Sequence, residues 1–151
     1  MLAPGEVIVV TASEFFHGSA GPIVITPAPS DDAFGSCSVD LRSSRTVDLI
    51  PHHGQLVETL EHVELPEDLA ARVDGRSVYA RQWLSVQTAS LIDPGWRGPI
   101  MLELMNLGKW PITIQEGEAI CAISFILLDQ PTDLPYYAKK GARFVRREDQ
   151  D

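Results

Sequence analysis

Apolar and polar side chains alternate over several short segments of this chain. Residues 56–63 give the longest alternating pattern, which is typical of a strand with one face toward a core and the other toward solvent. Shorter apolar runs at 23–25, 100–105, 112–114 and 119–128 are separated by turns, and each predicts a further strand. No helical pattern alternates with these strands, so we expect an all-β fold, either a β-barrel or a jelly roll.

Only short helical segments are predicted. Proline and acidic residues open the segment 66–73, as they do at helix N-termini, and Gly75 follows as a stop, so this segment is predicted to be helical. Residues 13–18 have a serine cap and a glycine stop and fit a single helical turn. The β-branched run within 6–11 and the pattern of 38–42 predict two more strands.

The length and composition of the chain fit one folded domain over residues 1–151. Of the 151 residues, 44% are hydrophobic and 22% are charged, as in ordinary globular proteins. No apolar run approaches the roughly 20 residues of a membrane-spanning helix, and the first residues lack the pattern of a signal peptide. We therefore expect a cytoplasmic protein without a membrane partner. Cys37 and Cys121 lack the spacing of a disulfide framework and are predicted to be small buried side chains.

The charge of the chain and its histidines limit its partners. A formal net charge of −9 argues against binding to nucleic acid, which requires a basic surface. His52 and His53 are adjacent, but no further ligands follow them at the spacing of a metal site. They, together with His17 and His62, are predicted to lie on the surface or in loops, and no metal site is expected.

The Gly-Arg-Ser sequence at 75–77 is a candidate phosphate-binding turn. Gly75 permits a tight turn, after which the guanidinium of Arg76, the hydroxyl of Ser77 and backbone N–H groups can converge on phosphate oxygens. An ordinary turn with a solvated arginine is the other interpretation, and the tripeptide alone favours that one.

Glu103 is the candidate for acid–base chemistry because it interrupts an apolar strand. Alternation places Met101 and Met105 on the same face as its carboxylate. If that face is buried, desolvation raises the pKa of the carboxylate and a nearby arginine lowers it, which is how a general base is adjusted toward neutral pH. The alternative is the solvated side of an edge strand, and the pattern leaves both interpretations open.

Taken in order along the chain, these motifs resemble the dCTP deaminase and dUTPase superfamily, and more closely its metal-free dCTP deaminase branch. The resemblance extends from about residue 23 to about residue 144, whereas residues 1–22 match poorly. The matching positions are 38–42, 65–69, 75–77 with Ala80 and Arg81, Thr88 with Ala89, 92–96, Leu102 and Glu103 with Asn106, Pro111 and Ile112 with Glu116 and Gly117, Pro135 with Tyr136, and 142–144.

The resemblance implies a fold, an assembly and a reaction. The fold is a distorted β-barrel with one or two short helices, and the assembly is a homotrimer with sites between subunits. The reaction is the hydrolytic deamination of dCTP to dUTP and ammonia, without zinc. Glu103 would act as the general base, while Ser77, Arg81 and the carbonyl of Ala89 would hold the water and the departing amine.

The resemblance also assigns residues to the nucleotide. It places Arg76 on the phosphates, Trp96 at the wall of the deoxyribose site and Asp93 among the residues that bind substrate. Mg²⁺ would bind only through the triphosphate, and its charge together with local arginines would offset the acidity of the chain.

The C-terminal tail, residues 131–151, would close over the triphosphate through Tyr136 and Arg143. Three departures from the family pattern affect the phosphates. Val78 stands where the deaminases usually have a second serine, Arg143 replaces a lysine, and residues 146–149 replace the usual glycine- and glutamine-containing end. Losing one charge-assisted hydrogen bond would weaken nucleotide binding roughly ten- to a hundredfold.

Two other functions stay open. A dUTPase, or a bifunctional enzyme that converts dCTP to dUMP, would use Asp93 to orient the water that attacks phosphorus. Against a pure dUTPase, those enzymes typically carry an apolar residue where Glu103 stands and end in a glycine-rich tail that is missing here. The second alternative is a non-catalytic relative that binds a nucleotide or a regulatory partner, and only Val78 and the altered tail support it.

Overall fold

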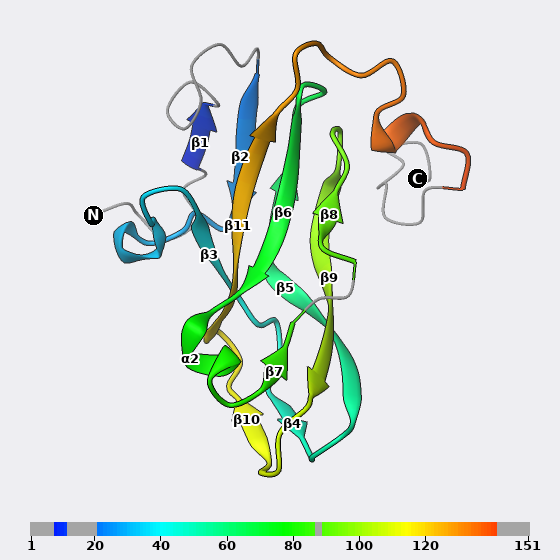
Figure 1. The fold of residues 1–151 in the computed structure, drawn as a ribbon. Coiled ribbons are helices and arrows are strands. Elements are labelled where there is room, and N and C mark those ends of the chain that lie inside the picture. Colours follow the sequence, from blue (N-terminus) through cyan, green and yellow to red (C-terminus); the bar gives the residue numbers. More distant parts are fainter. Residues whose placement is uncertain (1–7, 12–20, 87–88, 142–151) are drawn as a thin grey trace, which may run out of the picture.

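β-strands make up most of the computed structural model, which describes residues 8–11, 21–86 and 89–141 (Figure 1). In chain order the strands are β1 (Ile8–Thr11), β2 (Pro22–Thr26), β3 (Val39–Arg42), β4 (Val47–Leu49), β5 (Gly54–Glu64), β6 (Leu69–Gly75), β7 (Leu84–Ser85), β8 (Leu91–Ile92), β9 (Arg97–Asn106), β10 (Ile112–Ile114) and β11 (Ala119–Leu127). The helical segments are the 3₁₀ turns η1 (Asp31–Ala33) and η2 (Tyr136–Ala138) and the short α-helix α2 (Ser77–Ala80).

The strands pair into three sheets. One has the order β1-β2-β5-β9-β7, the second has the order β3-β11-β6-β8, and β4 and β10 form a separate pair. All the pairings are antiparallel. The β4–β10 pair forms the narrow lower end of the molecule in Figure 1, and the segment after β11 crosses to the side of β8.

The inward faces of the two larger sheets share one core. Alternate residues of β9, namely Ile100, Leu102 and Leu104, are buried, and β11 contributes Ile120 and Ile123 to the same cluster. This burial of alternate side chains from two facing sheets is how β-sandwiches and barrels remove apolar surface from water. It confirms the mostly β architecture predicted from the alternating patterns.

Most of the predicted strands are present. The apolar runs at 23–25, 100–105 and 112–114 lie in β2, β9 and β10, and the run at 119–128 forms β11. The alternation at 56–63 belongs to β5, in which the face of Val57, Thr59, Glu61 and Val63 is buried. Residues 13–18, predicted as a helical turn, lie outside the described residues.

The helix predicted at 66–73 is wrong. Residues 69–75 form β6, which pairs with β11 over its whole length, from Leu69 opposite Leu127 to Gly75 opposite Cys121. The proline and acidic residues that suggested a helix start form the turn before this strand. Because Leu69, Ala71 and Val73 enter the core and the ladder satisfies their backbone groups, tertiary pairing overrides the local signal.

The two cysteines differ. Cys121 is buried as predicted, and burial raises the pKa of its thiol, but Cys37 is exposed, so the prediction of a buried side chain is wrong there. Cys37 lies in the loop between η1 and β3, outside the core. His52, His53 and His62 are exposed, as expected. No helix among the described residues is long and apolar enough to cross a membrane.

Candidate active site

Glu103 lies in the middle of β9, on the face of the strand that points away from the core. β9 pairs with β5 at Glu103, and β7 pairs with the last two residues of β9, Met105 and Asn106. In the ladder Glu103 is opposite Leu56 of β5, and its side chain is half-buried. A hollow of about 330 Å³ there is lined by Gly54, Gln55, Leu56, Glu103, Leu104 and Met105. The hollow next to Glu103 therefore has a largely apolar lining.

Ala89 is brought to Glu103 by the loop between β7 and β8. Its backbone N–H donates a hydrogen bond to Glu103 Oε2, with the nitrogen and oxygen 3.0 Å apart. The structure thus brings together two of the residues that the sequence assigned to catalysis. The hydrogen bond fixes one oxygen of the carboxylate.

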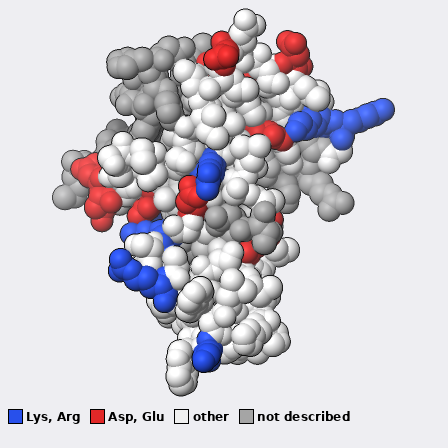
Figure 2. All heavy atoms as spheres, viewed as in Figure 1, with Lys and Arg blue, Asp and Glu red and all other residues white. Residues whose placement is uncertain are grey.

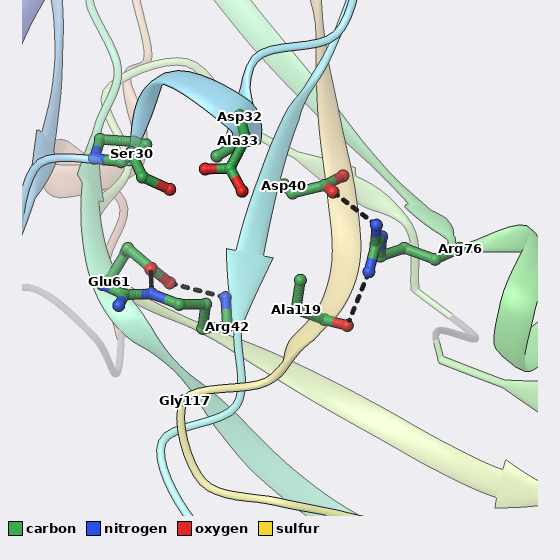
Figure 3. Close-up of a pocket in the computed structure, with 10 residues that line it drawn as sticks. Ser30, Asp32, Ala33, Asp40, Arg42, Glu61, Arg76, Gly117 and Ala119 are labelled. Atoms are coloured by element: carbon green, nitrogen blue, oxygen red, sulfur yellow. Dashed lines mark hydrogen bonds and ion pairs between the residues drawn. The ribbon is translucent and has the colours of Figure 1, made fainter.

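Arg76 follows the end of β6 and precedes α2, of which Ser77 is the first residue. Its guanidinium is held by two strands of the same sheet. Arg76 Nη2 pairs with Asp40 Oδ2 on β3 at 3.0 Å, and Nη1 donates to the carbonyl of Ala119 on β11 at 3.3 Å. Figure 3 shows both contacts at one wall of a hollow of about 400 Å³. Ser77 is exposed beside this wall.

A second arginine in the same hollow pairs with a buried carboxylate (Figure 3). Arg42 Nε donates to Glu61 Oε1 at 2.6 Å, and the backbone N–H of Arg42 donates to Oε2 at 2.8 Å. The side chain of Glu61 is only 1% exposed. Sequence reasoning missed this pair, although alternation had placed Glu61 on the same face as Val57 and Val63. A buried carboxylate needs such a partner because desolvation of an unpaired charge is costly.

A third cluster lies where the C-terminal tail passes the turn just before β9, which we call the corner. It contains Asp93 and Trp96 of the corner and Tyr136 of the tail. The rings of Trp96 and Tyr136 are 4.7 Å apart between centroids, and the backbone N–H of Tyr136 donates to the carbonyl of Pro94 at 2.8 Å. Lys139 forms an ion pair with Asp93. The tail residues up to 141 are therefore docked on the corner of their own chain, whereas Arg143 lies outside the described residues.

Gly95 permits this close approach. Its φ is +78°, and a Cβ placed on it would lie 2.6 Å from Cβ of Pro135 and 3.1 Å from the backbone nitrogen of Tyr136. A neighbouring contact supports the same docking, because Tyr137 donates a hydrogen bond to Glu67 and this bond raises the pKa of the phenol. Glycine is thus required here for its conformation and for its missing side chain.

Arg81 lines a different hollow from Glu103. This hollow, of about 630 Å³, lies between the turn after α2 and the turn after β9. Trp83, Leu107 and Trp110 also line it, and their side chains are 68%, 58% and 80% exposed. The predicted catalytic residues of one chain are therefore divided between separate surfaces.

Charges of both signs are interspersed on the face shown in Figure 2, and the described residues there form no broad basic surface. Among the described residues, no group of three or more His, Cys, Asp or Glu side chains is arranged to hold a metal ion.

Comparison with known proteins identifies the family. Residues 43–128 match the family model described as dCTP deaminase-like. A dCTP deaminase of Rhodospirillum rubrum is 38% identical over 82% of this chain and 84% of its own length. A dUMP-forming dCTP deaminase of Dictyoglomus thermophilum is 35% identical over 95% of this chain and 75% of its own length.

Solved structures of dUTPases share the fold. In one, the dUTPase of phage phi11 of S. aureus, the superposition covers 73% of this chain and 93% of that protein, with a TM-score of 0.63 and 17% identity. That structure shows how a structural Mg(II) ion is coordinated in the phage dUTPase. The resemblance seen in the motifs is confirmed, and the chain belongs to the dCTP deaminase-like family.

Proposed function

We propose that this protein catalyses the hydrolytic deamination of dCTP to dUTP and ammonia in the cytoplasm. The observation that carries the proposal is Glu103, a carboxylate held by the N–H of Ala89 in a half-buried, largely apolar hollow. The 38% identity to a dCTP deaminase supports the same reaction. Glu103 takes a proton from water as the water adds to C4 of cytosine, and it returns the proton to the amine as the C4–N bond breaks.

Ser77, Arg81 and the carbonyl of Ala89 hold the water and the departing amine. Because Arg81 and Glu103 line different hollows of one chain, we infer that a second copy of the chain places both around one nucleotide. We infer a homotrimer in which each site lies between subunits. Exposed apolar side chains beside both hollows, Leu56 next to Glu103 and Trp83 next to Arg81, are the kind of surface that a subunit contact covers.

The nucleotide is held by the residues that flank this centre. Arg76 binds the phosphates, and Mg²⁺ arrives bound to the triphosphate, which reduces repulsion from an acidic chain. Asp93 and Trp96 lie at the deoxyribose, and Tyr136 carries the tail toward the triphosphate, where Arg143 completes the closure. Zinc has no role in this reaction scheme, because Glu103 itself moves the proton.

A bifunctional enzyme that releases dUMP is the second candidate. The 35% identity to a dUMP-forming relative favours it, as does the presence of Asp93, which could orient a water toward phosphorus. The ion pair between Asp93 and Lys139 argues for deamination alone, because a carboxylate engaged with an ammonium group is less available to orient a water.

Product analysis separates these functions. The purified chain is incubated with Mg²⁺ and either dCTP or dUTP, and the nucleotides and ammonia are measured. We expect dCTP to give dUTP and ammonia in equal amounts, and dUTP to stay intact. Accumulation of dUMP would identify the bifunctional enzyme. Nucleotide binding without turnover would identify a non-catalytic relative.

A further inference from the structure

We propose that Asp40 is a positioning residue that holds the guanidinium of Arg76 in the orientation needed to receive the phosphates of the nucleotide. This inference rests on the proposed function, in which Arg76 binds the phosphates. The sequence assigned no role to Asp40 beyond that of a strand residue. In the structure Asp40 is the ion-pair partner of Arg76, and both residues line the hollow of Figure 3.

The two contacts of Arg76 come from neighbouring strands and fix its guanidinium at two nitrogens. Asp40 Oδ2 on β3 forms an ion pair with Nη2 at 3.0 Å, and the carbonyl of Ala119 on β11 accepts a hydrogen bond from Nη1 at 3.3 Å. The register of β3 and β11 shifts between Ala119 and Cys121, where the strand carries this carbonyl toward the arginine. Such irregularities in a ladder often redirect a group beside a functional site.

Fixing the arginine before the nucleotide arrives strengthens binding. A free arginine loses rotamer entropy when it is ordered, and that loss would otherwise oppose phosphate binding. A guanidinium has N–H donors on each of its nitrogens, so donors remain for phosphate oxygens after Asp40 and Ala119 have taken theirs. The side chain of Arg76 is 36% exposed and can still be reached by a ligand.

The negative charge of Asp40 opposes phosphate binding, so its benefit must come from geometry. Its side chain is 23% exposed, which leaves the carboxylate partly screened by solvent. Asp40→Asn keeps an acceptor oxygen for Arg76 and removes the charge, whereas Asp40→Ala removes both. The two variants therefore separate positioning from charge.

Calorimetric titration of the full chain tests the inference with two ligands, dCTP with Mg²⁺ and deoxycytidine, which lacks phosphates. We expect Asp40→Ala to weaken dCTP binding about tenfold and to leave deoxycytidine binding unchanged. Asp40→Asn should bind dCTP within about threefold of the original chain. In an Arg76→Ala background, Asp40→Ala should not weaken dCTP binding further, because no guanidinium remains for Asp40 to hold.

Controls separate this inference from the proposed function. Asp74→Ala removes the carboxylate of another exposed ion pair, Arg72–Asp74 at 3.2 Å, which does not line the hollow, and it should not change binding. The role of Asp40 would be overturned, and the proposed function left standing, in either of two cases. Asp40→Ala could weaken dCTP binding equally with and without Arg76, or it could fail to weaken it at all. If Arg76→Ala itself leaves dCTP binding unchanged, the placement of Arg76 on the phosphates fails, and this inference fails with it. Unfolding curves for each variant show whether it still folds, so that weaker binding caused by a misplaced Arg76 is distinguished from weaker binding caused by unfolding. Asp40→Asn, which keeps the size of the side chain, is the variant least expected to disturb folding.

Discussion

The backbone N–H of Ala89 donates a hydrogen bond to Oε2 of Glu103, and this contact ties the loop between β7 and β8 to the middle of β9. One carboxylate oxygen is thereby fixed, and Glu103 lines the hollow next to Leu56. A base held in this way loses little entropy when it accepts a proton in the reaction. The relationship makes Glu103 the first residue to test.

Glu103→Gln should lower the rate of ammonia release from dCTP by a factor of about 10² or more. Glutamine keeps the size of the side chain and an oxygen that can accept from Ala89, but it cannot take a proton from water. Binding of dCTP should persist. Glu58→Gln, at an exposed position of the neighbouring strand β5, serves as the matched control and should keep the original rate. Undiminished ammonia release by Glu103→Gln would remove Glu103 from its role.

Mixing two inactive variants tests whether each site lies between subunits. If Arg81 of one copy meets Glu103 of another, Arg81→Ala and Glu103→Gln trimers are each inactive. When equal amounts are unfolded together and refolded, random assembly restores both residues in about a quarter of the sites. Activity should therefore return to about a quarter of the original. No recovery, together with a 16.6 kDa monomer in light scattering, would argue against shared sites.

Val78→Ser should tighten dCTP binding. Val78 is 51% exposed in α2, directly after Ser77, where a hydroxyl could reach the phosphates bound by Arg76. One added charge-assisted hydrogen bond corresponds to roughly a tenfold gain in affinity, and the rate of chemistry on bound nucleotide should change little. Titration with dCTP measures the gain, and titration with deoxycytidine should show none. Equal affinities for dCTP would mean that the phosphates lie elsewhere.

Gly95→Ala should release the tail from the corner. Its Cβ would lie 2.6 Å from Pro135, so either the tail or the corner must move. Gly117→Ala is the matched control, because Gly117 has the same φ of +78° but no atom within 4 Å of its Cβ. Both variants place alanine at the same positive φ, and only Gly95→Ala adds the clash. Limited proteolysis should cut the tail faster in Gly95→Ala than in Gly117→Ala. Equal cutting rates would show that the tail does not dock there.

Much of the fold could be predicted because the alternating patterns are local. The burial of Val57 and Val63 follows directly from the alternation in β5. The segment 66–73 could not be assigned in the same way, because its proline and acidic residues are equally suited to a turn. Only pairing with β11, some fifty residues later in the chain, makes it a strand.

The sequence named candidate residues for the site but could not reveal their arrangement. A residue pattern can suggest that Glu103 is a base, but only the fold shows that it lies opposite Leu56 of β5 and accepts from the N–H of Ala89. The contacts of Arg76 with Asp40 and of Asp93 with Lys139 join residues far apart in sequence, with no spacing to reveal them. Glu61 did leave a signal, because alternation placed its carboxylate among core positions.

Asp93→Asn should leave the conversion of dCTP to dUTP largely intact, within about fivefold, because Asp93 braces the corner through Lys139 and does not act on C4 of cytosine. Lys139→Met removes the same ion pair from the other side and should have a similarly small effect, while Lys140→Met serves as the neighbouring control. Chromatography of the nucleotide products measures how much dUTP each variant forms. Accumulation of dUMP with the original chain, and its disappearance with Asp93→Asn, would instead assign to this carboxylate the orientation of a water at phosphorus.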